Sequence, residues 1–215
     1  MTKFYTLLAL VGLAITTNAQ TTIGMRGGAN YSNVMADDEY GVDTKFKFGA
    51  TGGIYVNIPV NKNFSIQPEL LYSGQGYNYD FAFSDESYVY DLDTKIKTDY
   101  LTLPVLAKYK FENGLVVELG PQVSYLLEGQ INQIVDKKVG NDVIHTSSTR
   151  IYLNDVDLVD ELDFAGVVGV GYELKGGYSI NARYTHGFTD FTKNDGDIKI
   201  KNQYFSLTVA IPFIK

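Results

Sequence analysis

From residue 20 onward, hydrophobic and polar residues alternate with a period of two, which is the pattern of β-strands that bury one face. The apolar face of this pattern contains no Asp, Glu, Lys or Arg, and its only ionisable residue besides tyrosine is His186. The pattern occurs in eight windows, at residues 23–31, 48–58, 64–72, 101–111, 115–127, 162–174, 178–188 and 205–213. The sequence therefore predicts an all-β fold of eight strands.

The connections between these windows alternate between short and long. Asn/Gly-rich turns at residues 60–63, 112–114 and 175–177 are typical of tight hairpins. The other connections are long, at residues 32–47, 73–99, 128–161 and 189–202. An even strand count, short turns at one end and long loops at the other are typical of a transmembrane β-barrel. We therefore predict an eight-stranded antiparallel up-and-down transmembrane β-barrel with long extracellular loops.

A soluble eight-stranded barrel of the lipocalin kind is the alternative, because alternation alone does not distinguish inside from outside. Three features favour the membrane form, the first of which is the asymmetry between short turns and long loops. The polar face is rich in Gly, Ser and Thr, which suit a narrow lumen, and aromatic residues gather at both ends of the apolar stripes, as in interfacial girdles. The girdle residues are Tyr31, Tyr72, Tyr125, Tyr184 and Phe188 at the long-loop end, and Phe64, Tyr109, Phe111, Tyr172, Tyr178 and Phe213 at the short-turn end.

The N-terminus has the order of a secretory signal peptide. Lys3 precedes the apolar stretch 7–15, and Thr17 and Ala19 stand at the positions that a signal peptidase reads. We predict a signal peptide at residues 1–19 and an outer-membrane barrel domain at residues 20–215.

Two segments resemble a known family. The sequence FSIQPELLY at residues 64–72 followed by YLTLPVLAKY at residues 100–109 is similar to the PorT-like outer-membrane β-barrel family typical of Bacteroidetes. The segment GMRGGANYS at residues 24–32 and Arg183-Tyr184 resemble that family too. The resemblance implies an eight-stranded barrel in the cell outer membrane with both termini in the periplasm. It also implies, for some members, a link to type IX secretion.

Length, net charge and amino-acid composition exclude several classes of function. The chain has 215 residues, enough for one domain, and its formal charge of −7 argues against nucleic-acid binding. It contains no cysteine, which excludes disulfides, thiolate metal sites and cysteine nucleophiles. After the N-terminal segment, no apolar run approaches the ~20 residues of a membrane-spanning helix. We find no phosphate loop, dinucleotide motif or zinc spacing, and we expect no cofactor and no metal.

Five charged residues are predicted to form one layer inside the barrel, because they occupy the inward face near the short-turn ends of their strands. They are Arg26, Glu69, Lys108, Glu118 and Arg183. Charges buried without a partner cost several kcal/mol each, so pairing is expected. The layer is interpreted as a structural plug, and the alternative is an ion gate in a small channel.

The long loops are acidic, holding 20 of the 25 carboxylates but only 10 of the 18 basic residues. Pairs at residues 91–93, 155–157 and 195–197 are candidate starts of a Ca²⁺ site, although none has the spacing of a known calcium loop, and solvated charge explains them as well. Alternation continues through Tyr77–Phe83 and resumes at Tyr88–Leu92, which predicts a tyrosine-rich hairpin above the membrane that binds a partner or packs on neighbouring loops.

Enzyme chemistry has little support in the sequence. His145 lies in a long loop near Ser147 and Ser148 without an evident third partner, and His186 lies on the lipid face near the outer girdle without a neighbouring nucleophile. We therefore expect a non-enzymatic protein with an envelope structural, adhesion or secretion-accessory role. A narrow passive channel and a lipid-modifying enzyme are the alternatives. The expected partners are outer-membrane lipid and lipopolysaccharide, together with other envelope or secretion proteins that contact the loops.

Overall fold

A computed structural model describes residues 21–36, 44–85, 87–139, 142–153, 159–190 and 200–214. The predicted signal peptide lies outside these residues. The strands are β1 (Thr22–Ala36), β2 (Thr44–Pro59), β3 (Phe64–Asp85), β4 (Tyr88–Lys110), β5 (Leu115–Val139), β6 (Asp142–Tyr152), β7 (Leu162–Glu173), β8 (Ser179–Gly187) and β9 (Ile200–Ile214). In the described part of the chain, no helix has the length and apolar character to cross a membrane.

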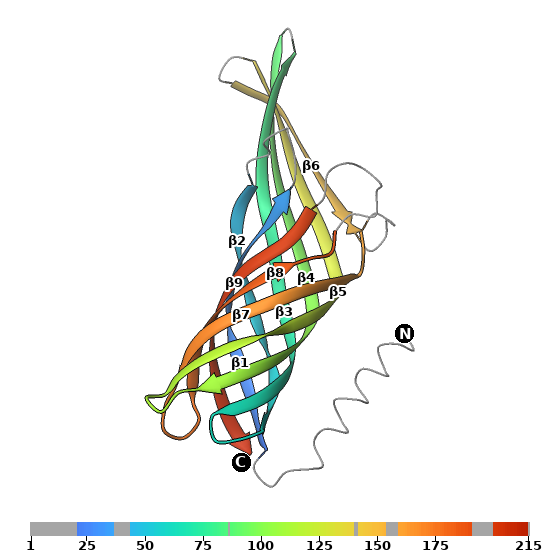
Figure 1. The fold of residues 1–215 in the computed structure, drawn as a ribbon. Helices are drawn as coiled ribbons and strands as arrows, with labels where there is room; N and C mark the ends of the chain where they lie inside the picture. The colour runs from blue at the N-terminus through green and yellow to red at the C-terminus, as the bar shows by residue number, and fades with distance from the viewer. Residues whose placement is uncertain are drawn as a thin grey trace.

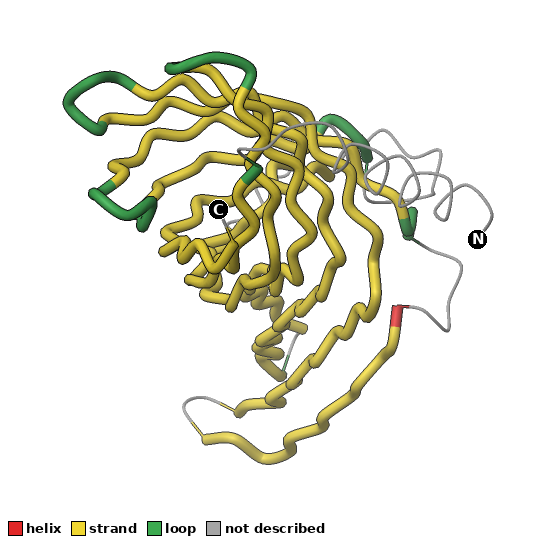
Figure 2. Tube along the Cα trace, turned by 90° about the horizontal axis from the view of Figure 1, so that it is seen from below, coloured by secondary structure: helices red, strands yellow, loops and turns green. Residues whose placement is uncertain are grey.

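Eight antiparallel strands close into a ring, as the alternation predicts. The order β4-β3-β2-β1-β9-β8-β7-β5 is completed by pairing between β4 and β5, so each of these strands has two neighbours (Figures 1 and 2). Strand β6 lies outside this ring and pairs with the distal part of β5, from Gln130 to Val139. The predicted eight-stranded barrel is confirmed, and β6 is an addition that the sequence pattern did not indicate.

The short turns and both ends of the described chain meet at one end of the barrel. Ile23 in β1 pairs with Ile214 in β9, and Thr22 pairs with Asn57 near the end of β2. In the β2–β3 turn, the Asn61 side-chain oxygen accepts hydrogen bonds from the backbone of Asn63 and Phe64. Gly114 in the β4–β5 turn has a φ of +91°, a conformation that glycine adopts without steric cost. Turn chemistry therefore sets the hairpins at this end.

The barrel is apolar outside and polar inside. Leu207, Val168 and Phe164 expose more than half of their surface on the outer face. The charged residues that the alternation places on the opposite face of their strands, Glu118 and Asp163 among them, are buried in the lumen. This polarity is the reverse of a lipocalin-type barrel, and it suits a wall that contacts lipid.

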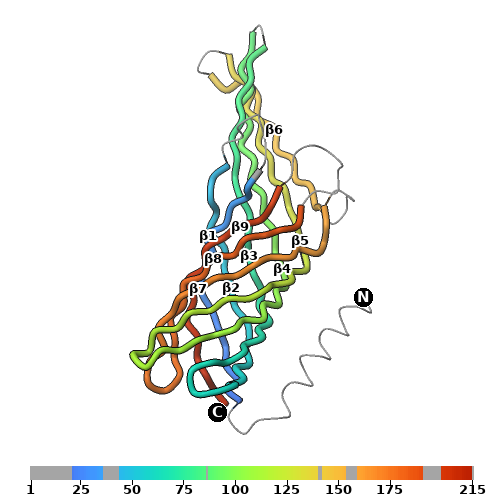
Figure 3. Tube along the Cα trace, in the orientation of Figure 1, coloured from blue at the N-terminus to red at the C-terminus, as the bar shows by residue number. Residues whose placement is uncertain are grey.

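Three strands extend far beyond the ring. β3, β4 and β5 have 22, 23 and 25 residues, whereas a tilted strand needs only about 9–11 to cross a bilayer. Together with β6 they form a sheet that rises from the end opposite the short turns (Figures 1 and 3). We call this the projecting sheet, comprising residues 77–85, 88–96, 130–139 and 142–152. The prediction of a long loop at residues 128–161 is therefore wrong for most of that segment, while the predicted hairpin within residues 73–99 is confirmed.

Candidate functional site

The five predicted lumenal charges lie together in the half of the barrel nearest the short turns. Each comes from a different strand, β1, β3, β4, β5 and β8, and each is between 2% and 7% exposed. Their side chains share the lumen because all sit on the inward face of strands in one closed ring. Ring closure therefore builds a buried ionic cluster from residues up to 157 positions apart.

Arg183 is the centre of this cluster. Its two terminal nitrogens each donate to one oxygen of Glu69 at 2.7 Å, a bidentate arrangement. Its Nε donates to Glu118 Oε1 at 2.6 Å, and Nη2 also donates to Glu118 Oε2 at 3.2 Å. A single guanidinium thus binds two buried carboxylates through charge-assisted hydrogen bonds, the strong class of such bonds.

Arg26 and Lys108 lie beside this core and are less fully paired. Arg26 Nη2 is 3.3 Å from Glu69 Oε1, and its Nη1 donates to the Thr208 hydroxyl at 2.9 Å. Lys108 Nζ donates to Gln67 Oε1 at 2.8 Å, and Gln67 in turn donates to Glu69. The structure therefore brings Lys108 to the cluster through an amide rather than through a direct ion pair.

Gln67 and Thr208 are members of the cluster that charge-based reasoning missed. Both occupy inward positions, and Gln67 lies two residues before Glu69 on the same face of β3. The alternation of the strands could have identified both residues. It places their side chains on the inward face, where every polar side chain near the cluster is a potential partner of a buried charge.

Uncharged polar groups fill the middle of the lumen. Gln122 and the Tyr204 hydroxyl hydrogen-bond across the barrel, and the Asn30 amide donates to Ser73. The cavity between these groups has a volume of only about 10 Å³, which is about the smallest space that holds one water molecule. The centre of the barrel is therefore closed by side chains.

The projecting sheet has one aromatic face and one charged face. The aromatic face continues the inward face of β4, and Phe83 stacks on Tyr90 across the strands with ring centroids 4.9 Å apart. Lys137 from β5 lies over the Tyr88 ring at 3.6 Å, a cation–π contact. Because the sheet stands beyond the ring, Phe81 and Phe83 are 56% and 47% exposed. This face is therefore an apolar surface that no described part of the barrel covers.

The opposite face carries alternating ion pairs. Lys95 binds Asp93 at 2.9 Å and Lys138 binds Asp91 at 2.5 Å. The hydrogen bond that Lys138 donates to the Asp91 carboxylate raises the pKa of Lys138 above its ordinary value. On this outer face of β4, Leu101 is apolar, whereas Lys95, which lies further from the short turns, is charged. The edge of the lipid-facing band therefore lies between Leu101 and Lys95.

Strand β6 forms one edge of the projecting sheet. All of its residues from Asp142 to Tyr152 are exposed, and within the described chain β5 is its sole strand partner. Its outer edge therefore presents backbone donors and acceptors that another extended chain can pair with.

Those candidate metal and catalytic residues that the structure describes do not assemble into sites. The described Ca²⁺ candidates, Asp91 and Asp93, are each held by a lysine, and the pairs at 155–157 and 195–197 lie outside the described residues. No group of metal-binding side chains occurs in the described part of the chain. His145 is exposed on β6, and His186 packs among Tyr184 and Phe188 with its Nδ1 3.4 Å from the Tyr184 hydroxyl.

Comparison with known proteins gives one family and a set of similar folds. The family described as outer membrane protein beta-barrel domain matches residues 18–193. No curated protein sequence matches the chain.

Among solved structures, Neisserial surface protein A is 12% identical with a TM-score of 0.48, covering 90% of this chain and 99% of that one. The attachment invasion locus protein Ail of Yersinia pestis is 12% identical with a TM-score of 0.40, covering 88% and 97%. OprG of Pseudomonas aeruginosa is 11% identical with a TM-score of 0.42, covering 90% and 96%.

Proposed function

Because the chain belongs to the outer membrane protein beta-barrel domain family, we propose that it is a non-enzymatic outer-membrane protein that binds a protein partner outside the cell through its projecting sheet. An adhesion or secretion-accessory role follows from such binding. The projecting sheet carries the proposal, because more than ten residues of each long strand are not needed to cross the bilayer. In this arrangement the barrel is a rigid base for the binding element.

The two faces of the sheet support binding over a purely structural role. Exposed aromatic rings are enriched where proteins bind partners, and Phe81 and Phe83 form such a patch with the half-buried Tyr90, on which Phe83 stacks. The open edge of β6 adds main-chain groups that favour pairing with an extended segment of the partner. A sheet that served only to cap the barrel would be expected to bury its apolar face.

The alternatives are less well supported. A passive channel needs a continuous path, whereas the middle of the lumen holds a cavity of about 10 Å³. A lipid-modifying enzyme needs a base with a nucleophile or carboxylate, whereas the His186 ring packs against Tyr184 and Phe188 and its cross-strand partners are Gly166 and Gln203. We also propose that the protein is a PorT-like member of its family, on the residues at 64–72 and 100–109.

The proposed orientation puts the short turns and both termini in the periplasm and the projecting sheet outside. Because the chain has no cysteine, a single introduced thiol reports its own location. In intact cells, a membrane-impermeant maleimide is expected to label Ser84→Cys, in the projecting sheet, and to leave Lys62→Cys, in the β2–β3 turn, unlabelled until the outer membrane is opened. Labelling of Lys62→Cys alone in intact cells would reverse the orientation.

A photo-crosslinking residue at position 83 tests the proposed partner surface. In intact cells it is expected to give a discrete protein adduct on gels, because the Phe83 ring lies in the exposed aromatic patch. The matched control places the same residue at position 207, on the outer face of the barrel, where lipid is the expected neighbour. The proposal is wrong if position 207 gives the same protein adduct, or if position 83 gives none.

A further inference from the structure

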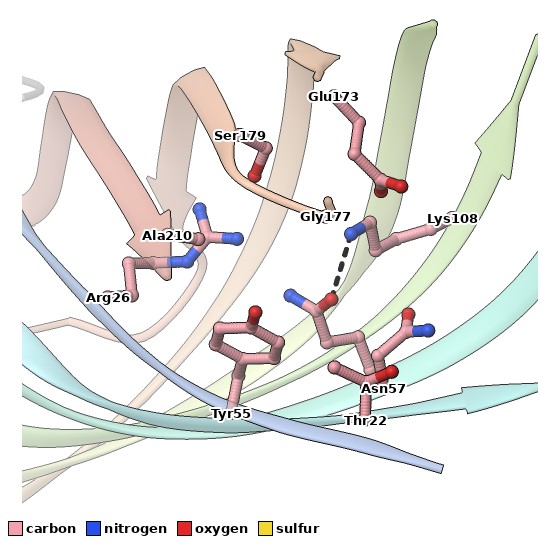
Figure 4. A pocket seen from close by; sticks show the side chains of 10 residues that line it. Thr22, Arg26, Tyr55, Asn57, Lys108, Glu173, Gly177, Ser179 and Ala210 are labelled. Carbon is pink, nitrogen blue, oxygen red and sulfur yellow. Dashed lines mark hydrogen bonds between the residues drawn. The ribbon is translucent and has the colours of Figure 1, made fainter. Parts of the chain in front are cut away.

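A cavity of about 190 Å³ lies inside the barrel at the short-turn end (Figure 4). It is lined by basic, hydroxyl and amide side chains, with one carboxylate: Arg26, Lys108, Tyr55, Asn57, Ser179 and Glu173. The volume exceeds that of a single water molecule several-fold. This cavity is a different space from the closed middle of the lumen.

The charges around the cavity do not balance. The buried cluster contains three cations and two carboxylates, and both carboxylates are engaged by Arg183. Lys108 has no carboxylate within ion-pair distance in the described chain and donates only to Gln67. Glu173 faces the cavity, but its Oε1 accepts a hydrogen bond from Lys110 at 2.6 Å. One buried positive charge therefore has no dedicated counter-charge, which is costly in a narrow lumen.

Arg26 also has N–H groups that donate no hydrogen bond within the described residues. Its side chain is 1% exposed, and its Nε and Nη2 make no hydrogen bond within the described residues, although Nη2 is 3.3 Å from Glu69 Oε1. Nε and Nη2 form the side edge of a guanidinium, which suits two oxygens of one planar or tetrahedral anion. In Figure 4, Arg26 and Lys108 point toward the cavity from opposite sides, and the Tyr55 hydroxyl points into it from below.

We propose that this cavity binds a small free oxyanion of the phosphate or sulfate class from the aqueous side of the membrane. Lys108 Nζ and Arg26 Nε bind its oxygens, and the Tyr55 hydroxyl donates a further hydrogen bond. The bound anion balances the third cation of the cluster and so stabilises the folded barrel. The site does not depend on the projecting sheet, which lies at the other end of the molecule.

Phosphate binding by the purified, folded protein in detergent is the test, measured by calorimetry and by the midpoint of unfolding. Inorganic phosphate is expected to bind saturably and to raise the midpoint above that in sodium chloride of equal ionic strength, because a ligand specific to the folded state stabilises it. Lys108→Met leaves the cluster neutral, so this variant is expected to fold and to bind phosphate roughly tenfold more weakly or worse, having lost one charge-assisted hydrogen bond.

Two further variants keep the test decisive. Lys62→Met removes an exposed lysine from a turn at the same end and is expected to bind phosphate like the parent. Tyr55→Phe removes only a hydroxyl and is expected to weaken binding even if Lys108→Met does not fold. The proposal is overturned if the parent binds no phosphate, if chloride gives the same stabilisation, or if neither Lys108→Met nor Tyr55→Phe weakens binding. Tighter binding of glycerol phosphate than of inorganic phosphate would assign the site to a lipid headgroup instead of a free anion.

Discussion

Replacing Arg183 with methionine is expected to lower the free energy of unfolding by about 3–5 kcal/mol, the usual cost of breaking a buried ionic contact from one side. The substitution removes four hydrogen bonds and leaves Glu69 and Glu118 buried, with Arg26 as the nearest remaining guanidinium. Urea unfolding of the folded protein in detergent measures the change. Because the chain has no tryptophan, tyrosine fluorescence and the heat-modifiable gel shift are suitable signals.

A matched control and a rescue separate charge burial from simple loss of packing. Lys95→Met breaks a pair whose partners are about half exposed, and it is expected to cost less than about 1 kcal/mol. Combining Arg183→Met with Glu118→Gln removes the carboxylate that loses its guanidinium, leaves Glu69 paired with Arg26, and keeps the net charge of the parent cluster. This double variant is expected to restore most of the lost stability. If the double variant is as unstable as Arg183→Met alone, the loss does not arise from an unpaired carboxylate, and the cluster is not an electrostatic plug.

The sequence was sufficient to predict which residues face the lumen, but not which of them touch. Period-two alternation assigns a face to every residue, so the burial of Arg26 and Glu118 follows from the pattern. Contact also depends on how far each strand is shifted against its neighbours when the ring closes. That shift puts Lys108 against Gln67, and nothing in the local sequence of either strand specifies it.

The projecting sheet shows a second limit of pattern reading. The β3–β4 hairpin was predictable because aromatic residues continue the alternation as far as Phe83. In β6 the sequence DVIHTSSTRIY is exposed on both faces, so no burial selects an apolar face, and the segment has the composition of a loop. Strand pairing with β5, a long-range interaction, defines that strand instead.

Removing the projecting sheet is expected to abolish partner binding while leaving the barrel folded. The pairing register shows where all four strands can be shortened at the same level. Directly opposite one another, in a row across the four strands, lie Asn78, Lys95, Asn132 and Arg150. Replacing residues 79–94 and 133–149 each with Asn-Gly closes two hairpins at this row with a turn suited to antiparallel strands. The interstrand contacts of the ring below the row are retained, and closure entropy changes only slowly with loop length, so little stability should be lost.

Two measurements decide this prediction, the heat-modifiable gel shift for folding and adduct formation or partner capture by intact cells for binding. The control keeps the sheet and replaces Asp93 and Lys95 with serine, which removes an ion pair from the charged face and leaves the aromatic patch in place. This control is expected to bind as the parent does, whereas the trimmed protein is expected to fold without binding. A trimmed protein that keeps its binding, combined with loss of binding in Lys108→Met, would transfer the function from the projecting sheet to the lumen. The parts of β3, β4 and β5 beyond the ring would then have no part in partner binding, and the polar lumen would be the binding surface of the protein.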